Sequence, residues 1–311
     1  MDLASKDISG FFGDGNLISG KDVASISLLH SSASGPFVVF KYSRNGRVSA
    51  LKAIADEYRG NPLYEDILRK EYEIGKILNH PNIREYYSLT TYPQTGLCIE
   101  MEWVDGCSLE ELIPKCREDA ELCDKIASQL LDAVKFIHLK QVVHRDLKPS
   151  NILITNNGSN VKLIDFSLSD SDSHLILKGN AGTALYASPE QIACQECDYR
   201  SDIWSLGVIL SEMSSRRIYR RVAAKCMRRE MSRRYRDVEA LEKALLHRSY
   251  SVAVAAVTSV LLLAVTAGVV YSQITKNEEF VDSELIDSIF FQATELLEDS
   301  GMDDVTISQD N

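Results

Sequence analysis

The sequence predicts an α+β fold, with a strand-rich first part followed by a larger helical part. The first part contains runs of apolar and β-branched residues, and an Asn-Gly pair at 45–46 suits a tight hairpin between two of them. The later part carries apolar residues at helical spacing. The predicted strands include 26–29, 36–42 and 48–54, and the predicted helices include 62–78, 109–113 and 120–139. Hydrophobic residues make up 45% of the chain, which is enough for a sizeable core and excludes global disorder.

The 311 residues allow one large domain or two modest ones, and their charge is unevenly distributed. The formal net charge is −11, but Lys and Arg outnumber Asp and Glu from 216 to 248, and the reverse holds from 273 onwards. All seven cysteines precede residue 252. Their odd number and irregular spacing favour free thiols in a reducing compartment, and the C-x-x-C spacing at 194–197 has no second pair nearby that would favour zinc.

Residues 144–151, HRDLKPSN, form the stretch around which the chain is organised. They combine a carboxylate, two cations, a carboxamide and a proline that stiffens the backbone. Apolar runs at 141–143 and 152–154 flank the stretch and predict a short buried strand on each side. A charged loop fixed between buried strands is typical of an active site.

This loop resembles the catalytic loop of the protein kinase family, H-R-D-x-K-P-x-N, at every defining position. Three further segments resemble family motifs, in the family's order. DFS at 165–167 resembles D-F-G, GTALYASPE at 182–190 resembles the end of the activation segment, and 199–210 resembles the buried helix whose aspartate, here Asp202, anchors the catalytic loop. The resemblance implies a two-lobed protein kinase-like fold, with a small antiparallel β lobe that includes helix C and a larger, shortened helical lobe.

The resemblance also implies the division of the chain. It covers about residues 25–247, where Arg234 matches the late arginine that pairs with the glutamate of the activation segment, here Glu190. We therefore expect an N-terminal lead-in at 1–24 and a protein kinase-like domain at 25–247.

A kinase-like large lobe implies that the chain binds ATP and Mg²⁺ and transfers the γ-phosphate to protein Ser/Thr hydroxyls. Asp146 would accept or orient the proton of the attacking hydroxyl, and Lys148 would neutralise charge on the γ-phosphate. Asn151 and Asp165 would hold Mg²⁺, which prefers oxygen ligands. A lysine two residues after the catalytic aspartate is the serine/threonine form of the motif, and Thr183 agrees with it.

The small lobe supplies the remaining residues that the resemblance implies. Lys52, on a predicted strand, would bind the α- and β-phosphates. Glu71 of the predicted helix would brace Lys52, and Glu73 is the weaker candidate because it lies on a different face of the helix. Backbone groups of Glu102 and Val104, in the segment between the lobes, would bond the adenine.

The sequence departs from the family at four places, and two of these departures, the degraded glycine-rich loop and the short span at 210–225, favour an alternative function. The glycine-rich loop at 31–37 keeps one glycine, and Ser167 replaces the glycine of D-F-G. Gly75 stands where the family has a large apolar residue, so we expect helix C to be loosely packed. The span 210–225 is short, so we expect one large-lobe helix to be missing. The alternative is a pseudokinase, a nucleotide- or protein-binding module with little or no transfer activity. The presence of every catalytic side chain favours the enzyme.

Residues 252–271 form an uncharged apolar stretch of about 20 residues. A helix of this length spans ~30 Å, the thickness of a bilayer core, although a buried core helix has the same pattern. The basic residues before it and the acidic residues after it predict a single-pass membrane protein with a cytoplasmic kinase domain and a short acidic extracytoplasmic tail at 272–311. This arrangement resembles bacterial transmembrane kinases.

The tail and the span predict few partners beyond ATP and protein substrates. Apolar residues between 280 and 297 suggest an amphipathic helix. Small residues in the span, such as Ala256, Ser259 and Gly268, permit self-association. We expect no nucleic-acid partner, because the membrane flank and the match of Arg234 already account for the arginine cluster.

Overall fold

The computed structural model describes the backbone of residues 24–31, 36–169, 185–276 and 287–292. Side chains are described in the same ranges except at 24, 30–31, 246–256 and 274–276. The chain divides into two compact units, Met1–Leu245 and Leu246–Asn311. Most of the predicted lead-in, glycine-rich loop and tail, together with Gly182 and Thr183 of the activation segment, lie outside the described residues.

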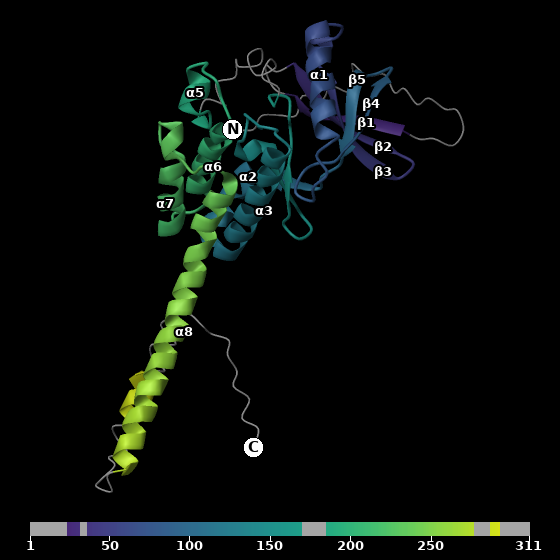
Figure 1. The fold of residues 1–311 in the computed structure, drawn as a ribbon. Coiled ribbons are helices and arrows are strands. Elements are labelled where there is room, and N and C mark those ends of the chain that lie inside the picture. Colours follow the sequence, from purple (N-terminus) through teal and green to yellow (C-terminus); the bar gives the residue numbers. More distant parts are fainter. Residues whose placement is uncertain (1–23, 32–35, 170–184, 277–286, 293–311) are drawn as a thin grey trace, which may run out of the picture. The chain divides into compact units, whose positions relative to one another are not determined.

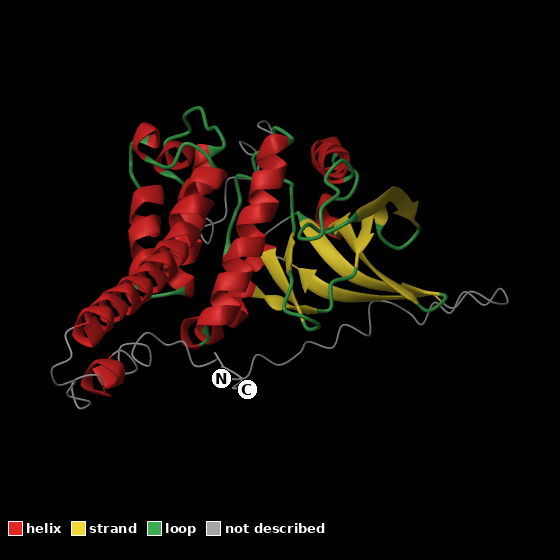
Figure 2. Cartoon of the chain, turned by 60° about the horizontal axis from the view of Figure 1, so that its bottom comes forward, coloured by secondary structure: helices red, strands yellow, loops and turns green. Residues whose placement is uncertain are grey.

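The small lobe is a five-stranded antiparallel sheet with one helix, as predicted (Figures 1 and 2). The strands lie in the order β1-β2-β3-β5-β4. Asn45 and Gly46 both have positive φ, 52° and 76°, so the Asn-Gly pair forms the expected hairpin turn. The elements are β1 (Ala24–Ser31), β2 (Phe37–Arg44), β3 (Arg47–Ile54), the 3₁₀ turn η1 (Asp56–Tyr58), α1 (Pro62–Gly75), β4 (Tyr86–Tyr92) and β5 (Gly96–Glu102).

Helix α1 is the predicted helix C, and it is shorter than predicted. The side chain of Asn61 accepts a hydrogen bond from the backbone N–H of Leu63, and Pro62 occupies the first helical position, so the start is well defined. The helix ends at Gly75 rather than at residue 78. Its last turn tightens, since the N–H of Ile77 bonds the carbonyl of Ile74.

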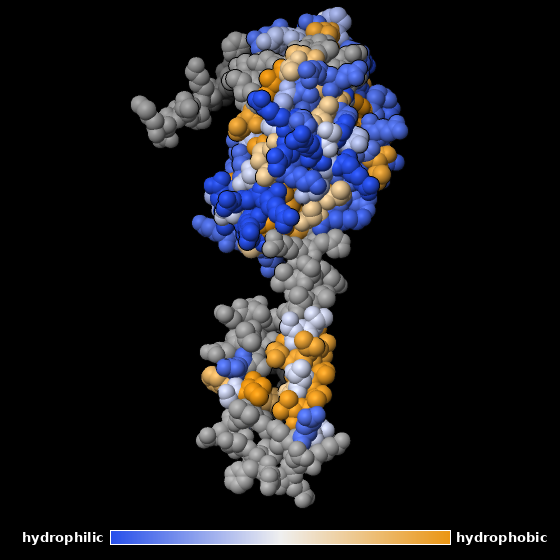
Figure 3. Space-filling view, turned by 60° about the vertical axis from the view of Figure 1, so that its left-hand side comes forward, coloured by the Kyte–Doolittle hydropathy of each residue, from blue (hydrophilic) through white to orange (hydrophobic). Residues whose placement is uncertain are grey.

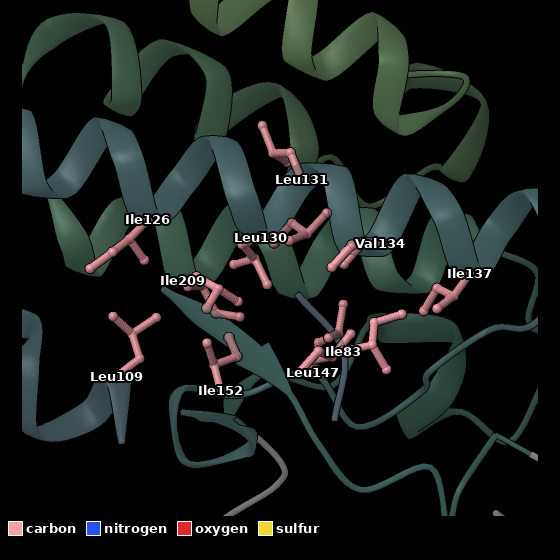
Figure 4. Packing of buried hydrophobic residues seen from close by; sticks show 14 of the residues in the cluster. Ile83, Leu109, Ile126, Leu130, Leu131, Val134, Ile137, Leu147, Ile152 and Ile209 are labelled. Atoms are coloured by element: carbon pink, nitrogen blue, oxygen red, sulfur yellow. The ribbon is translucent and has the colours of Figure 1, made fainter. Parts of the chain in front are cut away.

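The large lobe is mainly helical and carries a three-stranded antiparallel sheet in the order β6-β7-β8. Its elements are β6 (Gly106–Ser108), α2 (Leu109–Glu118), α3 (Ala120–Leu139), η2 (Pro149–Asn151), β7 (Ile152–Thr155), β8 (Val161–Leu163), α5 (Pro189–Ile192), α6 (Arg200–Met213), α7 (Arg217–Cys226) and η4 (Met231–Arg233). The apolar face of α3 forms the centre of the core (Figure 4). The side chains of Leu130 and Val134 contribute to it and are fully buried.

The strand predicted at 141–143 is wrong. After α3 the chain makes a turn at Gln141, which has a φ of 60°. The N–H of Val142 donates to the carbonyl of Ile137 and closes the end of the helix, so it is not available to a strand partner. The strand predicted after the loop is confirmed as β7, which pairs with β8.

The short connection in the large lobe brings α6 and α7 into direct contact. Only residues 214–216 separate them. Gly207 of α6 permits this approach, because a Cβ there would lie 2.4 Å from the Cβ of Cys226. Helix α7 is also fixed to α3, since Tyr219 donates to the carboxylate of Asp124 at 2.6 Å. The predicted loss of a large-lobe helix thus corresponds to a compact α6–α7 pair.

Helix α8 (Val238–Lys276) begins in the first unit, where Val238, Leu241 and Leu245 are buried. It continues through the span predicted at 252–271, but the side chains of 246–256 lie outside the described part of the chain. The predicted membrane span is not confirmed: within the described part, no helix is both long and apolar enough to cross a membrane. The described side chains from 257 onwards are mostly apolar and exposed (Figure 3). Of the predicted tail helix, 287–292 is helical.

Candidate active site

The loop 144–151 is held by a buried carboxylate from α6. Asp202 has no exposed surface, and its two oxygens accept hydrogen bonds from the backbone N–H groups of His144 and Arg145 at 2.8 and 2.9 Å. His138 at the end of α3 lies 2.8 Å from the same carboxylate. Arg145 has a φ of 63°, a strained conformation that these bonds fix. The predicted anchoring role of Asp202 therefore has a clear structural basis.

This loop places Asp146 between Lys148 and Asn151. The Oδ2 atom of Asp146 lies 2.8 Å from the Lys148 ammonium and accepts a hydrogen bond from the Asn151 carboxamide at 2.9 Å. The Asn151 nitrogen also donates to the backbone carbonyl of Asp146 at 2.9 Å. The other carboxylate oxygen, Oδ1, is buried and has no hydrogen-bond partner among the described residues. A buried acceptor without a donor is unusual and marks a place where an incoming donor can bind.

Asn151 and Asp165 can both present oxygen atoms to a cation. Both hydrogen bonds of the Asn151 side chain use its nitrogen, which leaves the carbonyl oxygen facing elsewhere. Asp165 follows β8 and is only partly buried. In the described part of the chain, no group of three or more His, Cys, Asp and Glu side chains is arranged so that it could hold a metal ion. Asn151 and Asp165 are thus two oxygen ligands for the predicted Mg²⁺, which stays a prediction.

Lys52 on β3 links the two lobes. Its ammonium lies 2.8 Å from Glu71 on α1 and 2.7 Å from Asp165. Glu71 is buried, whereas the Glu73 side chain is 61% exposed and pairs with Lys76, which excludes Glu73 as the partner of Lys52. The structure therefore brings Lys52 and Glu71 together as the sequence predicted, and it adds Asp165 to the pair.

Burial and these contacts shift the pKa values of all three groups. Burial by itself would lower the pKa of Lys52, but the Asp165 and Glu71 carboxylates outweigh it and raise that pKa. Burial would raise the pKa of Asp165, but Lys52 and the Ser167 hydroxyl hold it well below its usual range. Burial raises the pKa of Glu71, although the Lys52 charge acts in the opposite direction. A cation and an anion are thus fixed where phosphate and metal would bind.

Ser167 does not strain the turn that contains Asp165. The positive φ at this turn, 66°, falls on Asp165 itself and not on Ser167. The Ser167 hydroxyl donates to Asp165 at 2.7 Å, a bond that glycine cannot make. The substitution therefore adds a contact that orients the carboxylate.

The segment between the lobes offers backbone rather than side-chain contacts. Glu102 ends β5, and its carboxylate pairs with Lys162 at 2.8 Å and accepts a bond from the N–H of Glu85. The side chain is therefore committed elsewhere. Val104, two residues later, is buried. The use of backbone groups at both positions to bind adenine stays a prediction.

The end of the activation segment is tied to the catalytic loop. Glu190 and Arg234 form a buried pair with two hydrogen bonds, at 2.6 and 2.7 Å, as predicted. Ser188, where the family has alanine, caps α5 through a capping box with Gln191. The Gln191 carboxamide donates to the carbonyl of Arg145 at 2.8 Å. Sequence reasoning missed this link, because a glutamine at this position belongs to no motif.

Helix α1 is not loosely packed at Gly75, contrary to the expectation from the sequence. The ring of Tyr86 on β4 fills the space above Gly75 and contacts Phe166 edge-on, with ring centroids 6.3 Å apart. The Tyr86 hydroxyl donates to Glu71 at 3.1 Å. Sequence reasoning missed Tyr86. The signal was an aromatic residue on the strand next to a helix that carries glycine at the contact position.

A protein kinase domain model matches residues 33–284. A CBL-interacting serine/threonine-protein kinase of Arabidopsis thaliana is 37% identical over 57% of this chain and 41% of its own length. A probable serine/threonine-protein kinase of Streptomyces coelicolor is 34% identical over 55% of this chain and 27% of its own length. Among solved structures, a point mutant of the PknI kinase domain of Mycobacterium tuberculosis superposes with a TM-score of 0.55, covering 73% of this chain and 95% of that one. At 18% identity this likeness shows the fold alone.

The two-lobed fold and the family match define the class of protein. The chain belongs to the protein kinase family, and the predicted family membership is confirmed. The chain spans about two fifths of the length of the curated relatives it matches.

Proposed function

We propose that this chain is an active serine/threonine protein kinase that transfers the γ-phosphate of ATP to protein hydroxyls. The observation that carries the proposal is the state of Asp146. One of its oxygens is held by Lys148 and Asn151, and the other is buried without a partner among the described residues. A substrate hydroxyl is the donor that would satisfy this oxygen, and Asp146 would then orient that hydroxyl or accept its proton.

The other predicted site residues support the same reaction. Lys52, fixed by Glu71, would bind the α- and β-phosphates, and backbone groups at Glu102 and Val104 would bond the adenine. Lys148 would approach the γ-phosphate, where negative charge develops during transfer. Lys52 and Lys148 are each already held by a carboxylate, so little reorganisation of these two side chains is needed when the nucleotide binds.

Asn151 and Asp165 would hold Mg²⁺. Their oxygen atoms fit this cation better than they fit a softer metal, and the Asn151 nitrogen is turned away from the site by its two bonds to Asp146. When bound, the ion would bridge phosphate oxygens and neutralise charge. The role of the protein is to keep the two ligands at fixed positions, and for Asp165 this is done by Lys52 and Ser167.

The test is phosphate transfer by the full-length chain. Wild-type protein with Mg-ATP should label itself or an added protein acceptor on serine or threonine. Asp146→Asn should reduce this signal at least about a hundredfold, the lower range for the loss of a general base. Asp132→Asn, at a half-exposed position of α3 outside the candidate site, is the matched control and should retain the activity.

The same experiment separates the enzyme from the pseudokinase alternative. The glycine-rich loop at 31–37, which keeps one glycine, is the observation that favours the alternative. A wild-type protein that binds Mg-ATP and transfers no phosphate would be a binding module. Equal labelling by wild type and Asp146→Asn would also count against the enzyme.

We also propose that the chain is located at a membrane with the kinase domain in the cytoplasm. This proposal is supported by the uncharged sequence at 252–271, by the exposed apolar side chains from Val257 to Tyr271 and by the basic residues that precede them. The check is alkaline washing of cell membranes that contain the full-length protein. The protein should stay with the membranes, and its release into the soluble fraction would contradict the proposal.

A further inference from the structure

We propose that Tyr86 is a positioning residue for phosphate transfer: it occupies the space left by Gly75 and holds Glu71, and through Glu71 also Lys52, in the productive position. The inference rests on the proposed kinase function. It adds a residue on β4 to the groups that prepare the nucleotide site.

The first support is the contact between Gly75 and the Tyr86 ring. A Cβ atom at Gly75 would lie 2.5–2.6 Å from three ring carbons of Tyr86, which is too close for any side chain. The backbone at Gly75 does not itself demand glycine, because its φ lies outside the left-handed region. Glycine is therefore required here by the ring, and the two residues form a complementary pair.

The second support is the way in which the Glu71 carboxylate is shared. Its Oε2 atom accepts a hydrogen bond from Lys52 at 2.8 Å, and its Oε1 atom accepts one from the Tyr86 hydroxyl at 3.1 Å. Glu71 and Tyr86 are both buried, so water cannot replace either bond. Burial, and then the Glu71 charge, raise the pKa of Tyr86, which keeps its hydroxyl protonated and able to donate.

The third support is the continuation of this contact into the large lobe. The Tyr86 ring meets Phe166 edge-on at 6.3 Å, and Phe166, fully buried, packs against the His144 ring at 5.0 Å. Phe166 directly follows the metal-ligand candidate Asp165, and His144 begins the catalytic loop. Tyr86 thus connects helix α1 with the two segments that carry the catalytic groups.

A tyrosine placed only to fill space would not need its hydroxyl in this position. Phenylalanine would pack equally well and would bring no hydroxyl into the buried site. The hydroxyl instead supplies a donor to the carboxylate oxygen that Lys52 does not use. Without it, Glu71 would have a buried acceptor without a donor and would be less well fixed toward Lys52.

The experiment compares four variants of the full-length chain with Mg-ATP and a protein acceptor. Tyr86→Phe should lower kcat/KM for ATP about tenfold, with the KM for the acceptor unchanged, because a hydrogen bond to a charged group is lost at the nucleotide side only. Gly75→Leu should lower it further, since the ring must move. The double variant Gly75→Leu/Tyr86→Ala, in which leucine takes the place of the ring, should recover to about the level of Tyr86→Phe, because the space is filled again but the hydroxyl is still missing. Tyr87→Phe, the neighbour on β4, is the control.

Two results would overturn the inference. One is an unchanged kcat/KM for ATP in Tyr86→Phe. The other is a double variant no better than Gly75→Leu, which would show that the two positions are independent. If wild type transfers no phosphate, the proposed function fails. The affinity of wild type and the variants for Mg-ATP, measured by calorimetry, then tests this inference. The variants should follow the same order in affinity as they are expected to follow in kcat/KM for ATP.

Discussion

The two halves of the candidate site are held by different kinds of contact. In the large lobe, Asp202 bonds the backbone N–H groups of His144 and Arg145, so the position of the catalytic loop depends on main-chain bonds to one buried carboxylate. In the small lobe, Lys52 is positioned by side chains, Glu71 and Asp165. These come from a helix and from the other lobe.

Substitutions in the two halves should therefore differ in whether they mainly reduce stability or mainly reduce activity. Loss of the main-chain anchor leaves buried N–H groups without acceptors and should destabilise the fold. Loss of a side-chain contact around Lys52 leaves the fold largely intact and should reduce the use of ATP. Four predictions test this separation, beginning with the largest expected effect.

Asp202→Ala should cause the largest loss of stability. It removes the acceptor of two buried N–H groups and the partner of His138, so the free energy of unfolding should fall by about 3–5 kcal/mol. Urea unfolding followed by circular dichroism measures the change. Asp132→Ala, whose side chain is 49% exposed, should change it by less than about 1 kcal/mol. A similar loss of unfolding free energy in both variants would show that Asp202 has no special role in holding the catalytic loop.

Glu71→Gln should affect activity more than stability. The glutamine keeps a neutral contact with Tyr86 but removes one of the two carboxylates around Lys52, so kcat/KM for ATP should fall about tenfold. Steady-state kinetics at varied ATP gives the value. Glu73→Gln on the exposed face of α1 should behave as wild type. If Glu71→Gln lowered the unfolding free energy as much as Asp202→Ala does, the contacts around Lys52 would matter for stability as much as the anchor of the catalytic loop.

The pH dependence of stability should differ between wild type and Asp202→Asn. Burial by itself would raise the pKa of Asp202, but bonds from His138 and His144 lower it below its ordinary value. A lowered folded-state pKa stabilises the protein above the unfolded value of ~3.9, and this contribution is lost as the pH falls through the folded-state pKa. Urea unfolding between pH 6 and 3 should therefore show a shallower decline for Asp202→Asn. If the unfolding free energy of both proteins declined with the same slope, Asp202 would not contribute to the pH dependence of stability.

Ser188→Ala should give the smallest effect. It removes the cap of α5 and should cost about 1 kcal/mol in unfolding free energy, as should Ser108→Ala, which removes the same type of cap from α2. Only Ser188→Ala should also lower kcat, by a few fold, because Gln191 of the capping box bonds the carbonyl of Arg145. Equal activity in the two variants would show that α5 does not support the catalytic loop.

The sequence predicted the main charged groups of both halves of the site, but not all of the contacts that hold them. Contiguous motifs identify Asp146, Asn151 and Asp165, because local spacing dictates which groups meet in the loop. The role of Tyr86 depends on a contact between a strand and a helix that are separate in the sequence. The strand expected at 141–143 failed for a similar reason, since an apolar run does not reveal whether its N–H groups already serve a helix end.

The paired fit of Gly75 and Tyr86 limits how this part of the chain can change over generations. A larger residue at Gly75 meets the ring, and a smaller residue at Tyr86 leaves both a void and a carboxylate oxygen without its donor. Either single substitution thus weakens the protein, whereas the two together replace one packed arrangement of side chains with another. Sequences of descendants should therefore show the two positions changing as a unit, with the glycine and the tyrosine kept or lost together.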